Sequence, residues 1–221
     1  MRKLFGFLFL CAFSYNLASQ PLVSNFKQFK GLKELSVTGS IKVILLYGQH
    51  EGYGTDDKVS SGNSGIKESF SKGRLTLITE PKVPDQDQIV IYVYFKTLVR
   101  IFTNGNAMLV CPGRIEQPSI NLYASGNSSM QLELLVRRLK AELDGQAVVT
   151  LRGRGVQETV NTDGLSKFLA GDFKCETVFA RAESDSEILV YVEKEMRTNG
   201  SENIRYLGNP ASVDGDNTSR Y

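Results

Sequence analysis

Three acidic residues recur at a nearly constant spacing and are the most site-like residues in this sequence. Asp144, Asp163 and Glu183 each stand directly before a bend residue, 19 and 20 residues apart. If the segments that carry them stack as neighbouring strands, their carboxylates lie about 4.8 Å apart. Carboxylates that close repel one another, and they can bind a hard cation or divide acid and base roles. The acidic column is therefore a candidate calcium site.

Two other interpretations of the acidic column stay open. It could be a polysaccharide-cleaving pair of the kind that other β-helical enzymes carry. The interpretation that we favour is a solvated edge, whose repulsion is screened by salt and by nearby Arg152, Arg154 or Lys174. Because a fold alone implies no chemistry, we predict neither enzymatic activity nor a cofactor.

Other motifs of catalytic and cofactor sites give no stronger candidate. The segment Gly62-Asn-Ser-Gly65 sets a serine between glycines, but His50 lies only 14 residues away in the same loop, and no buried carboxylate is implied. His50 is the only histidine, which excludes a conventional zinc site. The sequence has no phosphate-binding or dinucleotide-binding glycine motif.

The elements that must position the acidic column form an internal repeat. Seven bend residues define frames of one phase: Gly39, Gly105, Gly126, Gly145, Gly164, Ser184 and Gly200. The residues four before, four after and six after each bend are apolar, whereas the residue directly before it is polar. This period of two, continued through every bend, predicts short strands with one buried face. Glycine suits the bend because a side chain there would collide with the core.

The spacing of the frames predicts the architecture. From Gly105 onward, successive bends are 21, 19, 19, 20 and 16 residues apart. Units this short cannot bury their inner faces alone, so neighbouring units must stack. We therefore predict an all-β fold, a parallel β-helix with some antiparallel strands at its N-terminal end. The alternative is an antiparallel β-sandwich, which has many short strands but no single repeated phase.

The N-terminal third of the chain is less regular. Alternation predicts strands within 35–45 and 74–79, and the apolar run 89–95 is the most strongly strand-forming stretch. The segment 49–72 is rich in Gly, Ser and Asp, so we predict a long loop there. No amphipathic helix of useful length is present.

The first 19 residues have the features of a secretory signal peptide. Arg2 and Lys3 precede an apolar stretch at 4–13, and Leu17-Ala18-Ser19 forms a small-residue cleavage region. No stretch reaches the roughly 18 apolar residues that span a bilayer, so we predict no transmembrane helix. We predict one exported domain over 20–221, with its core at about 26–215, located in the periplasm, at the outer cell surface or in the medium.

The charge balance of the chain excludes one class of partner. Removal of Arg2 and Lys3 leaves equal numbers of basic and acidic residues, whereas nucleic-acid binders carry a basic excess, so we predict no nucleic-acid partner.

Cys111 and Cys175 could pair or be buried separately. Cys11 raises the possibility of lipidation, but the residue before it is a leucine where a small residue is needed.

Two surface features are less specific. The basic residues Arg137, Arg138 and Lys140 fit a solvated strand edge. Tyrosines are numerous for a chain without tryptophan, and those that point outward could stack on sugar rings or on a partner protein, although half-buried sheet tyrosines explain most of them. They are Tyr47, Tyr53, Tyr92, Tyr94, Tyr123 and Tyr191.

At these residues the chain resembles the auto-transporter adhesin head GIN domain family of exported bacterial proteins. The matching features are the leader, the segment Leu35-Ser-Val-Thr-Gly-Ser-Ile-Lys-Val43, the strand near residue 90, the serial bends, and the closing Tyr206-Leu-Gly-Asn-Pro210. The resemblance covers roughly 26–215. It implies a right-handed β-helix with coils of about 19 to 21 residues and an adhesion role, with no catalytic residues to carry over.

The chain departs from the family pattern in two ways. Relatives commonly have serine where this sequence has Asp144, Asp163 and Glu183, and Ser184 replaces one glycine. These departures leave the predicted fold unchanged and make one face more acidic.

The function that we expect is an exported binding module of the cell envelope, whose regular sheet face binds a glycan or an envelope protein. One alternative is a carbohydrate-active enzyme centred on the acidic column. Another is a structural assembly protein, because the open ends of a β-helix expose strand edges that can pair into a homo-oligomer.

Overall fold

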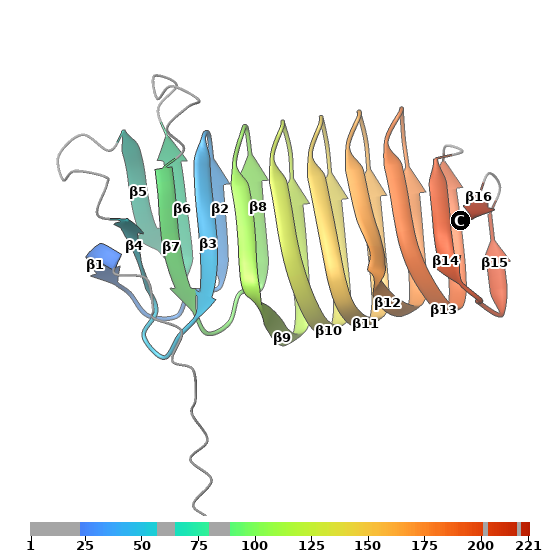
Figure 1. The fold of residues 1–221 in the computed structure, drawn as a ribbon, viewed down its shortest axis with the longest axis horizontal. Helices are drawn as coiled ribbons and strands as arrows, with labels where there is room; N and C mark the ends of the chain where they lie inside the picture. The colour runs from blue at the N-terminus through green and yellow to red at the C-terminus, as the bar shows by residue number, and fades with distance from the viewer. Residues whose placement is uncertain (1–22, 57–64, 80–88, 201–202, 216–217) are drawn as a thin grey trace, which may run out of the picture.

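The computed structural model describes residues 23–56, 65–79, 89–200, 203–215 and 218–221, which form an elongated solenoid of strands (Figure 1). All sixteen strands of these residues belong to one wound sheet. The strands are β1 (Val23–Gln28), β2 (Glu34–Thr38), β3 (Ile41–Tyr47), β4 (Gly52–Asp56), β5 (Ile66–Ser71), β6 (Arg74–Thr79), β7 (Ile89–Phe95), β8 (Arg100–Asn104), β9 (Met108–Ala124), β10 (Ser129–Leu143), β11 (Val148–Thr162), β12 (Lys167–Ala182), β13 (Glu187–Gly200), β14 (Ile204–Gly208), β15 (Ser212–Asp214) and β16 (Thr218–Arg220). The predicted β-solenoid is confirmed.

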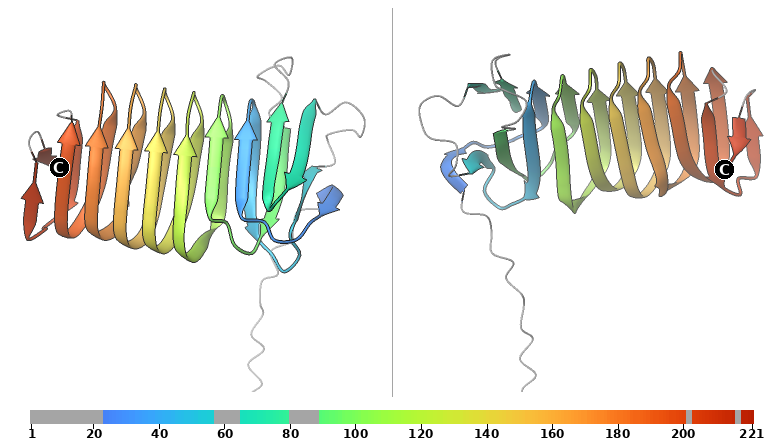
Figure 2. Two further views of the ribbon diagram at one scale, coloured as in Figure 1. Left: turned by 180° about the vertical axis from the view of Figure 1, so that it is seen from behind. Right: turned by 45° about the horizontal axis from the view of Figure 1, so that its top comes forward.

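Five long strands, β9 to β13, form the regular part of the solenoid. Each turns a corner partway along its length, so one strand contributes to two faces (Figures 1 and 2). Neighbouring long strands pair in parallel, and Ala141 of β10 lies opposite Leu122 of β9 and Val160 of β11. All three side chains are fully buried. The period of two read from the sequence therefore identifies the inner face.

Close approach of successive coils explains the glycines at the bends. Gly145 has φ +73°, and a Cβ atom built on it would lie 3.1 Å from the backbone oxygen of Gly126 in the preceding coil. Such a backbone conformation is rarely adopted by residues that carry a side chain. Ser184 is the exception in this row of bends, with φ +56°.

The last frame differs from the prediction. Gly200 pairs with Ala182, two residues before Ser184, so this bend is out of phase with the others. Ile204 then returns to the register of Ile188. A shift of two residues keeps every side chain on its original face, and for this reason Met196 is still fully buried.

Antiparallel strands close the N-terminal end, as predicted. Strand β4 pairs with β1 and β7, and β5 pairs with β6. Phe29 stacks on Phe70, with ring centroids 4.4 Å apart, so aromatic rings cover this end of the core. The prediction of a long loop over 49–72 is wrong where β4 and β5 lie. The side chains of β5 are mostly exposed, so no apolar period marks the strand.

Polar residues close the C-terminal end. Two inner rows continue from β13 through Ile204 and Tyr206 of β14 and end at Thr218 and Arg220 of β16. Terminal units of solenoids commonly become polar where no further coil covers the core.

Cys111 and Cys175 are both buried and free, so they do not form a disulfide. Burial raises the pKa of the Cys111 thiol to about 11 and also raises that of Cys175. Nothing helical in the described part of the chain is long and apolar enough to cross a membrane. The predicted leader and Cys11 lie outside the described residues.

Candidate functional site

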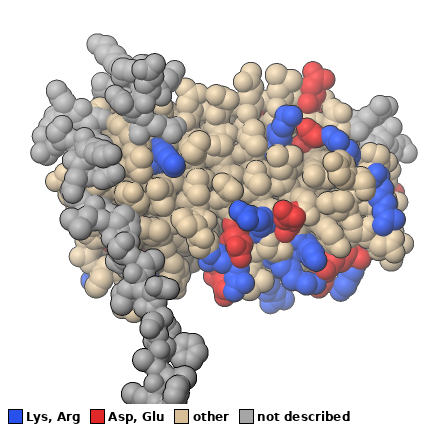
Figure 3. Space-filling model, in the orientation of Figure 1, with Lys and Arg blue, Asp and Glu red and all other residues tan. Residues whose placement is uncertain are grey.

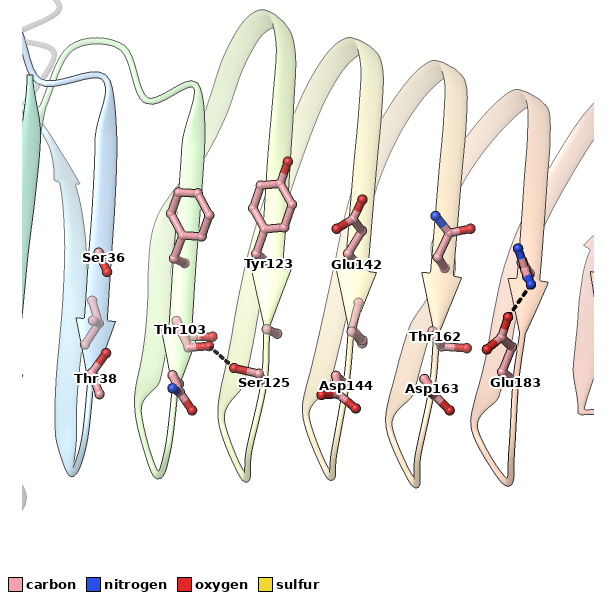
Figure 4. Close-up of a pocket in the computed structure, with 17 residues that line it drawn as sticks. Ser36, Thr38, Thr103, Tyr123, Ser125, Glu142, Asp144, Thr162, Asp163 and Glu183 are labelled. Atoms are coloured by element: carbon pink, nitrogen blue, oxygen red, sulfur yellow. Dashed lines mark hydrogen bonds and ion pairs between the residues drawn. The ribbon is translucent and has the colours of Figure 1, made fainter.

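Two rows of outward side chains follow the solenoid axis on the face formed by β2, β8 and the second halves of β9 to β12. The row next to the bends consists of Thr38, Asn104, Ser125, Asp144, Asp163 and Glu183. The row two residues earlier consists of Ser36, Phe102, Tyr123, Glu142, Asn161 and Arg181. Together they line a groove of about 630 Å³, which we call the axial groove (Figure 4).

Buried hydroxyl groups support the floor of the axial groove. The hydroxyls of Thr103 and Ser128 share a hydrogen bond of 2.9 Å, and those of Thr162 and Ser186 share one of 2.8 Å. Each bond joins the end of one strand to the start of another coil, and all four residues are buried. Because these polar groups are satisfied, they stabilise the bends instead of destabilising the core.

The three acidic residues predicted from the sequence lie in one row of the axial groove (Figure 4). Oδ1 of Asp144 accepts a hydrogen bond of 2.7 Å from the backbone N–H of Gly145, and Asp163 accepts the equivalent bond from Gly164. The carboxylate of Glu183 pairs with Arg181 in the neighbouring row. Each carboxylate therefore has a partner within its own coil.

Asp163 also accepts a hydrogen bond of 2.6 Å from Oγ of Ser184 in the next coil. This bond, followed by the one from the Gly164 N–H, lowers the pKa of Asp163. A catalytic acid at neutral pH needs a raised pKa, so the environment of Asp163 keeps it ionised and unsuited to that role.

Among the described residues, no group of three His, Cys, Asp or Glu side chains lies close enough to hold a metal ion. Asp144, Asp163 and Glu183 thus share a row without converging on one point. The calcium hypothesis stays a prediction, and a titration that tests it is given below.

Two parallel aromatic rings lie in the row of the axial groove farther from the bends. The rings of Phe102 and Tyr123 are 4.6 Å apart between centroids and inclined by only 8°. The guanidinium of Arg74 lies 5.5 Å from the centroid of Phe102, and both Arg74 and Arg100 pair with Glu34. This aromatic pair gives the polar groove one flat apolar element.

A smaller groove of about 180 Å³ continues the axial groove toward the C-terminal end. It shares Asn161 and Arg181 with the axial groove and adds Phe179 of β12 and Arg197 of β13. The guanidinium of Arg197 lies 5.7 Å from the ring centroid of Phe179. We call this the C-terminal extension of the groove.

Sequence reasoning named Tyr123 but missed Phe102 and Phe179. The signal was available, because Phe102 stands three residues before its bend and Phe179 five before its own, and these odd offsets share the outward parity of the acidic column. The other predicted tyrosines lie outside both grooves: Tyr47, Tyr53, Tyr92, Tyr94 and Tyr191.

The basic residues expected to screen the acidic column do not line its groove. Arg154 pairs instead with Glu193, and Lys174 lies 5.3 Å from the ring centroid of Tyr191. Arg152, Arg154 and Lys174 follow the bends by seven to ten residues, so they lie in the middle of the long strands and not at the ends that form the groove. This expectation was wrong because alternation gives parity and does not locate the corner.

A buried acid lies in the core away from the grooves. Glu158 of β11 is completely buried, and neither carboxylate oxygen has a hydrogen-bond partner. It stands between Leu139 and Val178 in an inner row. Burial raises the pKa of Glu158 to about 8, so it is largely protonated at neutral pH.

Comparison with protein families finds one match that spans most of the chain. Residues 32–210 match the family described as "Putative auto-transporter adhesin, head GIN domain". No curated protein matches the sequence.

Solved structures share the solenoid over most of their length. A "putative adhesin" from Bacteroides fragilis has 14% identity and a TM-score of 0.75, covering 88% of this chain and 91% of its own. A "putative adhesin" from Parabacteroides merdae has 14% identity and a TM-score of 0.65, covering 88% and 93%. A "putative lipid binding protein" from Parabacteroides distasonis has 15% identity and a TM-score of 0.57, covering 88% and 94%. At these identities the likeness establishes the fold.

Proposed function

Because the chain belongs to the auto-transporter adhesin head GIN domain family, we propose that it is an exported binding module that holds an extended ligand in the axial groove. In this proposal the protein binds without catalysing a reaction. The signal-peptide pattern of residues 1–19 supports a location in the cell envelope or outside the cell.

The observation that carries the proposal is the continuity of the axial groove. It crosses six neighbouring strands, β2 and β8 to β12, and combines a parallel aromatic pair with rows of hydroxyl, amide and carboxylate groups. Ligand sites commonly unite an apolar surface with a few polar groups that fix orientation. A groove this long suits a chain-like ligand better than a compact one.

The state of the carboxylates supports binding over catalysis. Asp144 and Asp163 are engaged by the backbone of their own bends, and the pKa of Asp163 is lowered. A glycosidase needs one carboxyl group that stays protonated to donate its proton. Neither contact of Asp163 favours that protonated state.

Binding of the purified protein to bacterial envelope fractions, separated into glycan and protein, tests this proposal. We expect the protein to bind one of the two fractions, and we expect the Tyr123→Ala variant to bind that fraction more weakly. Tyr47→Ala is the matched control, because Tyr47 is 75% exposed and lies outside the groove. Retention that is equal for all three proteins would refute the groove as the binding site, and release of reducing ends would refute a purely binding role.

A further inference from the structure

We propose that the ligand of the axial groove is an uncharged, β-linked polysaccharide that lies parallel to the solenoid axis. This inference rests on the proposed binding function of the groove and goes further by naming the chemical class of its ligand.

The first support is the length of the combined site. The axial groove and its C-terminal extension share Asn161 and Arg181, so they form one continuous surface. This surface crosses seven neighbouring strands, from β2 to β13. At about 4.8 Å between strands it is about 29 Å long, which is the dimension of an oligosaccharide and exceeds that of one or two sugars.

The second support is the repeat of the surface. Each coil offers one side chain to each row, so the contacts recur at about 4.8 Å along the axis. An extended β-linked pyranose chain repeats at nearly this spacing, so each sugar can meet one coil. An extended peptide places side chains of one face about 6.8 Å apart and loses this register within a few residues.

The third support is the order of aromatic and polar groups. Tyr123 of β9 and Phe179 of β12 are three strands apart, or about 14 Å, and each provides a ring beside the polar rows. Asp144, Asn161 and Asp163 lie in the interval. Sugar rings present apolar C–H faces to aromatic rings and hydroxyl groups to carboxylates and amides, so both kinds of surface are matched.

The fourth support is the internal pairing of charge. The two cations that line the grooves in the described structure, Arg181 and Arg197, pair with Glu183 and Glu195. Figure 3 shows the face that carries β3 and β7, on the other side of the solenoid from the groove, and basic and acidic side chains are interspersed there. The carboxylates of the groove, among them Asp144 and Asp163, would repel a polyanion. An uncharged polymer meets no such opposition.

Titration calorimetry tests this inference with the full protein and β-1,4-linked oligomers of glucose and of N-acetylglucosamine, two to six units long. Polygalacturonate and polylysine serve as anionic and cationic probes. We expect affinity for one neutral series to rise with length through about six units, the number that spans the combined groove. Tyr123→Ala and Phe179→Ala should each weaken binding of the hexamer about tenfold, whereas Tyr47→Ala should leave it unchanged.

Several results would overturn the inference, provided that thermal unfolding shows the variants to be folded. They are equal affinity for dimer and hexamer, tighter binding of a charged probe, no binding of either neutral series, and unchanged affinity in Phe179→Ala. If an envelope protein binds instead and Tyr123→Ala prevents it, the glycan class is wrong while the groove function stands. If Tyr123→Ala leaves ligand binding unchanged, the axial groove is not the binding site and the proposed function itself is wrong.

Discussion

Oγ of Ser184 donates a hydrogen bond of 2.6 Å to Oδ1 of Asp163, across two neighbouring coils and 21 residues of sequence. Ser184 is also the residue that replaces glycine in the row of bends, and it keeps φ +56°. One side chain thus introduces backbone strain and a stabilising bond between coils, so its two effects oppose each other.

Substitutions at Ser184 separate these two effects. Ser184→Ala removes the bond and keeps the strain, so we expect a lower free energy of unfolding than in wild type. Ser184→Gly removes both and should remain near the wild-type value. Urea unfolding measures the two variants, and an alanine variant as stable as wild type would contradict the assigned hydrogen bond.

The pH dependence of Ser184→Ala follows from the lowered pKa of Asp163. A lowered folded-state pKa adds stability that is present above the unfolded pKa of about 3.9 and is lost as the pH falls through the folded value. Wild type and variant should therefore converge in strong acid. A difference that persists unchanged from neutral pH to pH 2 would assign the effect to something other than the carboxylate.

The bend glycines predict a second stability effect. Gly145→Ala forces a side chain into a left-handed backbone conformation and toward the backbone oxygen of Gly126. We expect a loss of about 1 to 2 kcal/mol. Gly113→Ala is the matched control, because nothing lies within 4 Å of its added Cβ. Equal stability of the two variants in urea would show that close coil approach does not require glycine.

Glu158 predicts an unusual loss of stability with rising pH. Its folded pKa of about 8 exceeds the ordinary glutamate value of 4.5, so the folded state holds its proton more tightly than the unfolded state does. The free energy of unfolding is therefore highest below about pH 4.5, as far as this group is concerned. It declines from there up to about pH 8, by about 1.4 kcal/mol per pH unit within that window.

Glu158→Gln tests this pH effect, since its amide does not titrate. Unfolding midpoints measured between pH 5 and pH 8 should fall in wild type and change much less in the variant. Parallel curves for the two proteins would mean that the carboxyl group is hydrated or paired in solution. The exposed Glu116→Gln in β9 is the control for removal of a carboxylate, and it should follow the wild-type curve.

The alternation of apolar and polar residues predicted the solenoid because the inner face is apolar and continues from coil to coil. Leu122, Ala141 and Val160 occupy one fully buried row, and a shift of one residue would expose all of them. The same reasoning placed Asp144 and Asp163 on one outer row. A requirement for one type of residue can be recognised from a single sequence when it recurs at the same position of every coil.

Features that occur once were harder to predict. The corners of the long strands have no constant residue, so Arg154 was expected beside the acidic column and instead pairs with Glu193. Glu158 has inward parity, yet its type gave no reason to expect a buried acid. Gly200 matched the bends by type and parity although its pairing differs by two residues. These details depend on contacts with neighbouring coils, which the alternation of apolar and polar residues does not specify.

The acidic column makes a final prediction about calcium. The shared row of Asp144, Asp163 and Glu183 gave the calcium hypothesis its origin, but each carboxylate has a partner in its own coil. We therefore expect millimolar calcium to leave the thermal unfolding midpoint unchanged, in wild type and in an Asp144→Asn, Asp163→Asn double variant alike. A ligand present at 100 times its dissociation constant would add about 2.7 kcal/mol to the free energy of unfolding, which such a measurement detects. A calcium-dependent rise in wild type that the double variant lacks would instead establish the column as a metal site.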